Sequence, residues 1–247
     1  IQNRRRQTFT ESGVAQADAQ IRRQHPTDSP SLIVVGHASW EPGILGLIAG
    51  RINDSYYRPA IAVQIGTKVS RASARSIPEF DIISAMETCA PLFTKYGGHA
   101  RAAGFTIATV HMRELVARLR EIADIDMKGT QLQPELAIDC DALPSEVEGS
   151  NFDFVQGLSP FGESNPTPVF AARGIRVLEA RGVGGGKHLK MRLADAEKSW
   201  DAIAFRQGYQ TRIARTYIDV AYSLEWNTWQ GRKTLQMIVS DIKPAGS

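Results

Sequence analysis

The sequence predicts an α/β layer structure in its first half and a small all-β barrel in its second half, preceded by a connector helix. In the first half, short apolar runs alternate with segments whose apolar residues follow helical spacing, which indicates strands and helices stacked in layers. Beyond residue 134, three segments alternate strictly between apolar and polar residues, as strands with one buried face do. This change of period within 247 residues favours two domains.

The connector helix is predicted over residues 1–28. Its sequence is mostly polar and stops at the segment from His25 to Pro30, where two prolines interrupt the helix. A polar helix with a weak apolar stripe is expected to join this chain to something upstream. The first residue is Ile1 rather than methionine, so we expect a fragment of a longer protein or a trimmed chain.

The α/β domain is predicted over residues 29–128. One helix is expected from Pro42, which suits a first helical turn, and another from the N-cap Asp81 to the pair Gly97 and Gly98. A third helix is expected over residues 112–122, and strands are expected at 32–35, 60–65, 68–75 and 102–108.

A linker and helix are predicted over residues 129–157, and the barrel over residues 158–247. Its strands are expected at 169–177, 188–193, 200–205, 218–226 and 235–239. About five half-buried strands are typical of a small closed barrel.

Composition excludes several classes of function. No run of about 18 apolar residues is present, so we expect no membrane span. Cys89 and Cys140 match no paired metal spacing, which favours a reduced cytoplasm. The five histidines are scattered, and neither a phosphate loop nor a nucleophile motif is present. The residues therefore predict no metal site here and no catalysis by this chain alone, and a net charge of +3 is too small to indicate nucleic-acid binding.

Two short polar segments are candidates for a binding site. The segment Ser73–Ser76 ends a predicted strand and offers two hydroxyls and a guanidinium, groups that bind phosphate. The segment Gly97–Ala100 offers free backbone N–H groups and His99, which can donate to a phosphate. The residues leave open a second interpretation, in which the first segment is a solvated strand end and the second a helix C-cap.

The order and spacing of three segments resemble the DHH-associated domain, which follows a catalytic DHH domain in a superfamily of phosphoesterases. These segments are Trp40–Gly46, Ser73–Ser76 and Gly97–Gly104, the last with a glycine–glycine–histidine hallmark. In the second half, four further segments resemble the oligonucleotide-binding (OB) domain of RecJ-type 5′→3′ single-stranded-DNA exonucleases: Leu158–Phe170, Lys187–Lys190, Glu225–Arg232 and Leu235–Met237. The resemblance implies a mixed sheet with flanking helices followed by an OB barrel, and a connector helix from a missing N-terminal DHH domain.

The resemblance also implies roles for residues of the first half. Ser73, Arg75 and Ser76 are expected to hold the 5′ phosphate of the strand. His99 is the expected catalytic residue and, with the backbone of Gly97 and Gly98, is expected to contact the phosphodiester that is cut. Two positions depart from the family pattern: Glu41 stands where histidine is common, and Ala74 where glycine is usual.

Residues of the barrel are expected to grip the following single strand. Alternation places His188, Lys190 and Arg192 on the face opposite the apolar residues of their strand, so they are candidate backbone contacts. Trp229 lies in a predicted hairpin loop and is a candidate for stacking on a base.

The resemblance implies that the full-length protein is an exodeoxyribonuclease and that this chain alone is inactive. Mg²⁺ or Mn²⁺ is expected on the absent DHH domain and none on this chain. Single-stranded DNA is the expected substrate, and a helicase or a single-strand-binding protein is a partner by family only. Two alternatives stay open: a non-catalytic nucleic-acid-binding or scaffold module, and a small-nucleotide phosphodiesterase, for which a second domain has no evident use.

Overall fold

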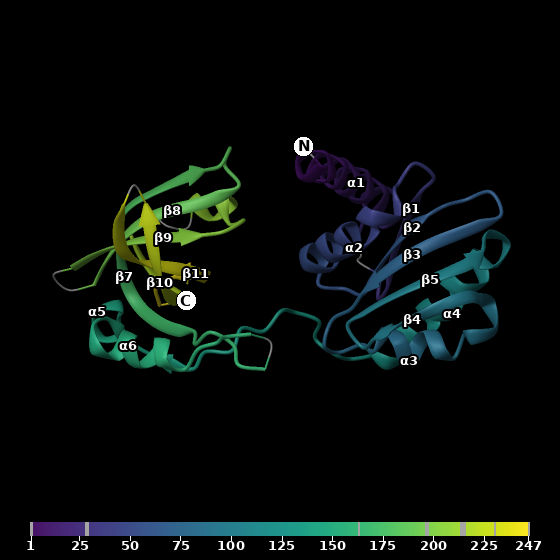
Figure 1. The fold of residues 1–247 in the computed structure, drawn as a ribbon. Helices are drawn as coiled ribbons and strands as arrows, with labels where there is room; N and C mark the ends of the chain where they lie inside the picture. Colours follow the sequence, from purple (N-terminus) through teal and green to yellow (C-terminus); the bar gives the residue numbers. More distant parts are fainter. Residues whose placement is uncertain are drawn as a thin grey trace. The chain divides into compact units, whose positions relative to one another are not determined.

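The chain folds into two units, Ile1–Pro134 and Glu135–Ser247, each with a hydrophobic core of its own (Figure 1). The structure is a computed structural model, and it describes residues 2–27, 30–162, 164–195, 198–212, 216–229 and 231–246. Side chains are described from residue 5 onward, except that of Trp229. Within this part of the chain, no helix is long and apolar enough to cross a membrane.

The first unit is built on a five-stranded mixed sheet in the order β1-β2-β3-β5-β4. β1 and β2 are parallel and joined through α2, whereas every other neighbouring pair is antiparallel. The predicted mixed sheet with flanking helices is confirmed. The elements of this unit are α1 (Gln2–Gln24), β1 (Ile33–His37), α2 (Pro42–Tyr56), β2 (Ala60–Gln64), β3 (Val69–Arg75), α3 (Ile82–Glu87), β4 (Phe93–His99), β5 (Ala102–Ala108) and α4 (Met112–Asp126).

Helices cover the two faces of this sheet unequally. α1 and α2 pack on one side of the sheet, around Ile33, Val35 and Ile48, and α2 reaches across β2 to β3. α3 and α4 pack on the other side of the sheet, over a core that runs from Leu32, just before β1, to Ile107 on β5. The outer part of the first face, over β5 and β4, is therefore left without a helix (Figure 1).

The first helix packs on the body of the first unit. Ala17 and Ile21 are fully buried against α2, and the Trp40 indole donates a hydrogen bond to Gln16 Oε1 at 2.8 Å. The weak apolar stripe of this polar helix is thus enough to dock it.

The helix predicted from Asp81 to Gly97 is much shorter than expected. Asp81 caps it, accepting from the N–H groups of Ile83 and Ser84, but the helix ends at Glu87. A short 3-10 turn at Ala90–Leu92 contains Pro91, which cannot continue an α-helix, and β4 follows it. Gly97 and Gly98 lie in this strand, so the prediction that they end a helix is wrong.

The second unit is a closed five-stranded barrel, as predicted from period-two alternation. β10 pairs with β11 on one side and with β7 on the other, which closes the sheet β10-β11-β9-β8-β7 on itself. The elements are β6 (Cys140–Asp141), α5 (Pro144–Val147), α6 (Ser150–Gly157), β7 (Phe170–Val183), β8 (His188–Asp195), β9 (Lys198–Ala204), β10 (Tyr217–Trp229) and β11 (Arg232–Pro244).

Two small helices seal the barrel core. Val147 of α5 and Phe152 of α6 are buried with the strand residues. Buried Asp195 links helix α5 to the strands. It accepts a hydrogen bond from the Trp200 indole of β9 at 2.8 Å and one from the Ser145 N–H of α5 at 2.7 Å. Burial raises the pKa of Tyr222, whose hydroxyl donates to the Ala142 carbonyl. The residues that pack on the barrel core therefore begin at about residue 142, ahead of the five barrel strands.

Candidate nucleic-acid interface

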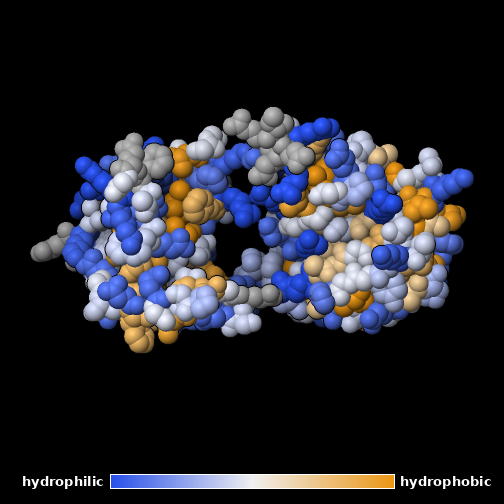
Figure 2. Space-filling model, in the orientation of Figure 1, coloured by the Kyte–Doolittle hydropathy of each residue, from blue (hydrophilic) through white to orange (hydrophobic). Residues whose placement is uncertain are grey.

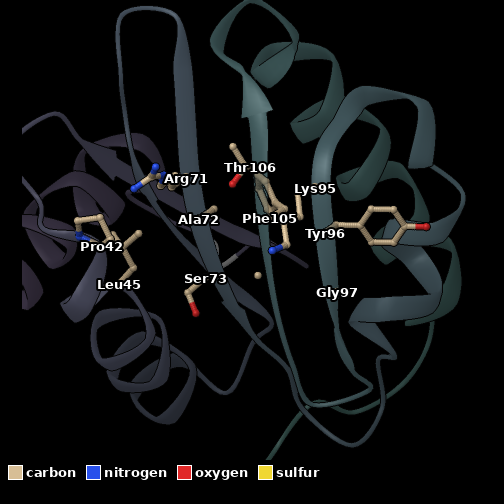
Figure 3. Close-up of a pocket in the computed structure, with 11 residues that line it drawn as sticks. Pro42, Leu45, Arg71, Ala72, Ser73, Lys95, Tyr96, Gly97, Phe105 and Thr106 are labelled. Atoms are coloured by element: carbon tan, nitrogen blue, oxygen red, sulfur yellow. The ribbon is translucent and has the colours of Figure 1, made fainter.

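The face of the first sheet that carries α1 and α2 also has a groove of about 440 Å³, between the start of α2 and strand β4 (Figure 3). Its side chains stand in rows, because neighbouring strands are in register and residues two apart share a face. The first row is Arg71, Thr106 and Lys95. Within the described chain, no residue that lines the groove is acidic, so the groove is a cationic surface.

The second row forms the floor of the groove. Ser73 pairs with Gly104, which pairs with Gly97. A Cβ built on Gly97 would meet nothing within 4 Å, and one on Gly104 would meet only the Ala72 carbonyl at 3.4 Å. Two adjacent strands thus have no side chains here, and a ligand can approach their backbone closely.

The third row contains Arg75 and His99, which flank Ala102. Neighbouring strands are about 4.8 Å apart, so the Cα atoms of Arg75 and His99 lie roughly 10 Å from each other. The side chain of His99 is exposed at the end of the β4–β5 hairpin. The structure therefore brings four of the predicted residues, Ser73, Arg75, Gly97 and His99, onto one surface.

The guanidinium of Arg75 is held before any ligand arrives. Its Nη1 donates to the Ala74 carbonyl at 2.8 Å and to the Ser73 hydroxyl at 3.3 Å. A Cβ on Gly46 of α2 would lie 3.0 Å from Nη2, so the glycine provides the space for this side chain. Donors that are already oriented lose less freedom when they bind an anion.

Ser76 does not share this surface. It is 2% exposed, and its hydroxyl donates to the Phe80 carbonyl at 2.6 Å. Its backbone is bound too, because the N–H donates to the Arg101 carbonyl and the C=O accepts from Arg101 Nε. The hydroxyl is occupied in fixing a loop, so the predicted phosphate contact by Ser76 does not fit the structure.

Gly98 allows the close approach of β4 and β5, the two strands that form part of the groove. It lies at φ 157°, and a Cβ there would come within 2.4 Å of the Ala102 carbonyl and 2.5 Å of the Ala103 Cα. Only glycine allows β4 and β5 to approach this closely. Its role is to build the strand pair on which Gly97 and His99 are placed.

Sequence reasoning missed Arg71, Lys95 and Thr106, which form the first row. Arg71 had a signal, because it lies two residues before Ser73 on the same strand. Lys95 was concealed by an irregular register: Phe93 pairs with Ile107 but Lys95 with Thr106, which leaves Thr94 as an extra residue. This β-bulge lets Phe93 pack against Phe105 in the core while Lys95 faces the groove. Tyr96 points away from the groove in Figure 3.

The outer face of β8 carries the three predicted residues of the barrel. Leu189, Met191 and Leu193 are buried, and His188, Lys190 and Arg192 alternate with them on the outside. His188 is oriented by the Arg206 N–H, which donates to its Nδ1 at 2.8 Å. The side chain of Trp229 lies outside the described residues.

Lys190 and Arg192 have different neighbours, so we expect different contributions to binding. Lys190 pairs with Arg181 and Ile203, whereas Arg192 pairs with Glu179 and Asp201 and donates to the Ser199 hydroxyl at 3.1 Å. Lys190→Ala should weaken single-strand binding about fivefold, and Arg192→Ala less than twofold, since nearby carboxylates already offset its charge. Fluorescence anisotropy with a labelled oligonucleotide measures both, and equal losses would contradict the difference in environment.

The described residues offer no ligand set for a metal ion. They contain no group of three or more histidine, cysteine, aspartate or glutamate side chains close enough to hold one. Figure 2 shows that exposed apolar residues on the visible face are scattered among polar ones. The groove itself is lined by Arg71 and Lys95, with no acidic side chain among its described lining residues, so its surface charge is positive.

Two family models match the sequence of this chain, one in each unit. Residues 29–124 match the DHHA1 domain, and residues 138–241 match the RecJ OB domain. The chain is a DHHA1 domain followed by a RecJ OB domain. The groove belongs to the DHHA1 domain, and the basic outer face of β8 belongs to the RecJ OB domain.

Curated relatives align with the chain across both of these domains. The chain is 29% identical to the single-stranded-DNA-specific exonuclease RecJ of Bacillus subtilis over 214 residues, which are 85% of this chain and 27% of that protein. It is 30% identical to RecJ of Thermus thermophilus in an alignment of 254 positions that covers 98% of this chain and 33% of that protein. The chain thus spans about a third or less of these two relatives.

A crystal structure of RecJ from Thermus thermophilus in complex with Mn²⁺ has a similar fold. The TM-score is 0.73 at 27% sequence identity, and the match covers 99% of this chain and 35% of that one. A Mg²⁺ complex of the same protein gives a TM-score of 0.72. The DHHA1 and RecJ OB domains of this chain therefore have the fold of the corresponding part of RecJ.

Proposed function

We propose that this chain is the substrate-binding portion of a 5′→3′ single-stranded-DNA exonuclease. The observation that carries the proposal is the open groove of the DHHA1 domain, where Arg71, Lys95 and Arg75 surround a floor of two glycines. Cationic side chains around exposed backbone suit a phosphodiester chain. The RecJ relatives act on single-stranded DNA by name, which supports this choice of ligand.

The rows of the groove suggest how a strand is held. Side chains two residues apart along a strand repeat about every 6.8 Å, so Arg71, Ser73 and Arg75 offer successive contacts along one track. Arg75, oriented by Ser73, is the proposed contact to the 5′ phosphate. His99, at the same end of the track, is the proposed contact to the phosphodiester that is cut.

The chemistry is proposed to occur on a domain outside this chain. The RecJ structures from Thermus thermophilus hold Mn²⁺ or Mg²⁺, which supports a divalent cation in the whole protein. Among the described residues of this chain, no ligand set for such a cation is present. What these residues contribute is a bound and oriented strand, and the outer face of β8 is proposed to hold the strand further along.

Arg75→Ala tests the proposed 5′-end contact. The chain should bind a 5′-phosphorylated single strand about tenfold more tightly than the same strand with a 5′ hydroxyl, since a charge-assisted contact contributes roughly 1.5 kcal/mol. The variant should bind both strands equally, at the affinity of the unphosphorylated one. Anisotropy titrations at fixed salt measure the two constants.

Arg113→Ala is the matched control, because Arg113 is an exposed arginine of α4, on the other side of the sheet. It should keep the preference for the phosphorylated end. A preference that survives Arg75→Ala would assign the 5′ phosphate to another part of the protein.

A further inference from the structure

A second cavity lies at the opposite edge of the first sheet and shares no lining residue with the groove. Its volume is about 500 Å³, within the range of pockets that bind small ligands. It is formed where the edge strand β1 runs between α1 and α4. Its walls are largely apolar: Val34, Val63, Ile65, Met112 and Val116.

One cationic side chain in this cavity has an unmet hydrogen-bond requirement. The Nε of Arg120 is buried and, among the described residues, has no acceptor. A buried donor is nearly always paired, and a guanidinium stays charged at any physiological pH. The missing partner is therefore expected to be an anionic acceptor.

The neighbours of Arg120 do not supply that acceptor. The cavity is lined by the polar residues Gln20 and Gln24 of α1 and by His25, which follows α1, and Gln20 Oε1 already accepts from the Gly36 N–H at 3.1 Å. Within the described chain, no aspartate or glutamate lines the cavity. The cavity thus combines an arginine whose buried Nε has no acceptor among the described residues with a hydrocarbon wall.

We propose that this cavity binds an apolar carboxylate, with its anionic group on Arg120 and its hydrocarbon part between β1 and α4. A planar carboxylate matches the donors of a guanidinium. A single arginine matches a single negative charge better than a phosphate monoester, and the valine-rich wall favours a hydrocarbon over a sugar.

Calorimetric titration of the 247-residue chain tests the proposal. The first pair of probes is N-acetyl-leucyl-phenylalanine and its carboxamide, which differ only in the charged group. The acid should bind at least about tenfold more tightly than the amide. Equal affinity of the two, or no heat from the acid at millimolar concentration, would overturn the proposal even without a variant.

Variants on one helix locate the site. Arg120→Gln should reduce affinity for the acid about tenfold, to that of the amide, whereas Arg113→Gln should leave it unchanged. Arg120→Lys keeps a charge but not the fork of donors, so it should fall in between. Unchanged binding in Arg120→Gln would place the carboxylate elsewhere and refute the assignment.

Two further binding measurements identify the source of the ligand. Binding of 3-phenylpropionate as tight as that of the peptide acid supports a free small acid, whereas binding of the peptide acid alone supports a protein carboxyl terminus. A single-stranded oligonucleotide should not displace either acid, because the cavity and the groove have no residue in common. Displacement would assign Arg120 to nucleic-acid binding and overturn the proposal.

Discussion

Replacing Arg71 and Lys95 together by alanine is expected to lower the affinity for single-stranded DNA about thirtyfold at low salt. The two side chains stand in one row across β3 and β4, and none of the described residues that line the groove is acidic. Each should contribute roughly 1 kcal/mol as an exposed, partly screened phosphate contact. The loss should be the same for every base sequence, since phosphate contacts do not read bases.

The salt dependence gives a more specific signature than the affinity. The slope of log K against log salt should become shallower by about 1.4, because each contact to a single strand contributes about 0.7. Arg113→Ala combined with Arg118→Ala removes the same charge from α4, on the other side of the sheet, and should leave the slope nearly unchanged. Equal losses in the two double variants would show that net charge, not the groove, binds the strand.

Gly98→Ala is expected to destabilise the β4–β5 hairpin by about 2–3 kcal/mol. The new Cβ would lie 2.4 Å from the Ala102 carbonyl and 2.5 Å from the Ala103 Cα, and these are backbone atoms that cannot turn aside. Either the strands separate or the hairpin shifts, at the cost typical of overpacking. Hydrogen exchange should be about 30–100-fold faster in peptides that cover residues 93–108 and unchanged in peptides from the barrel.

Gly97→Ala is the matched control, one residue away. Its Cβ would meet nothing within 4 Å, so hairpin exchange should match that of the parent chain. The methyl group would stand on the floor of the groove, however, and should weaken single-strand binding several-fold. If Gly98→Ala left exchange in residues 93–108 at the parent rate, the close approach of the strands would not require a glycine.

Much of the architecture could be predicted because it depends on local pattern. Period-two alternation predicts the barrel strands and the outward face of His188 and Lys190, and Asp81 caps a helix as expected. The length of that helix could not be predicted, because a pair of glycines can end a helix or lie within a strand whose backbone is exposed. Pro91 was the stronger signal.

The groove was only partly predictable, because it depends on register between strands. Ser73, Arg75, Gly97 and His99 were found from their segments, but Arg71 and Lys95 join them only through cross-strand pairing. Under regular alternation Lys95 would share a face with Phe93, so the sequence pattern conceals it. Ser76 was misplaced because its burial depends on the path of the loop to Phe80.

The extra residue at Thr94 determines which deletions this strand can tolerate. Removing Thr94 would make Phe93, Lys95, Tyr96 and Gly97 alternate regularly, and each would keep the side of the sheet it occupies now. Removing any single residue between Lys95 and His99 would instead move the preceding side chains to the opposite face of the sheet. The ammonium group of Lys95 would then face the hydrophobic core. Grafting or shortening this strand therefore requires attention to the parity of the residue count as much as to residue identity.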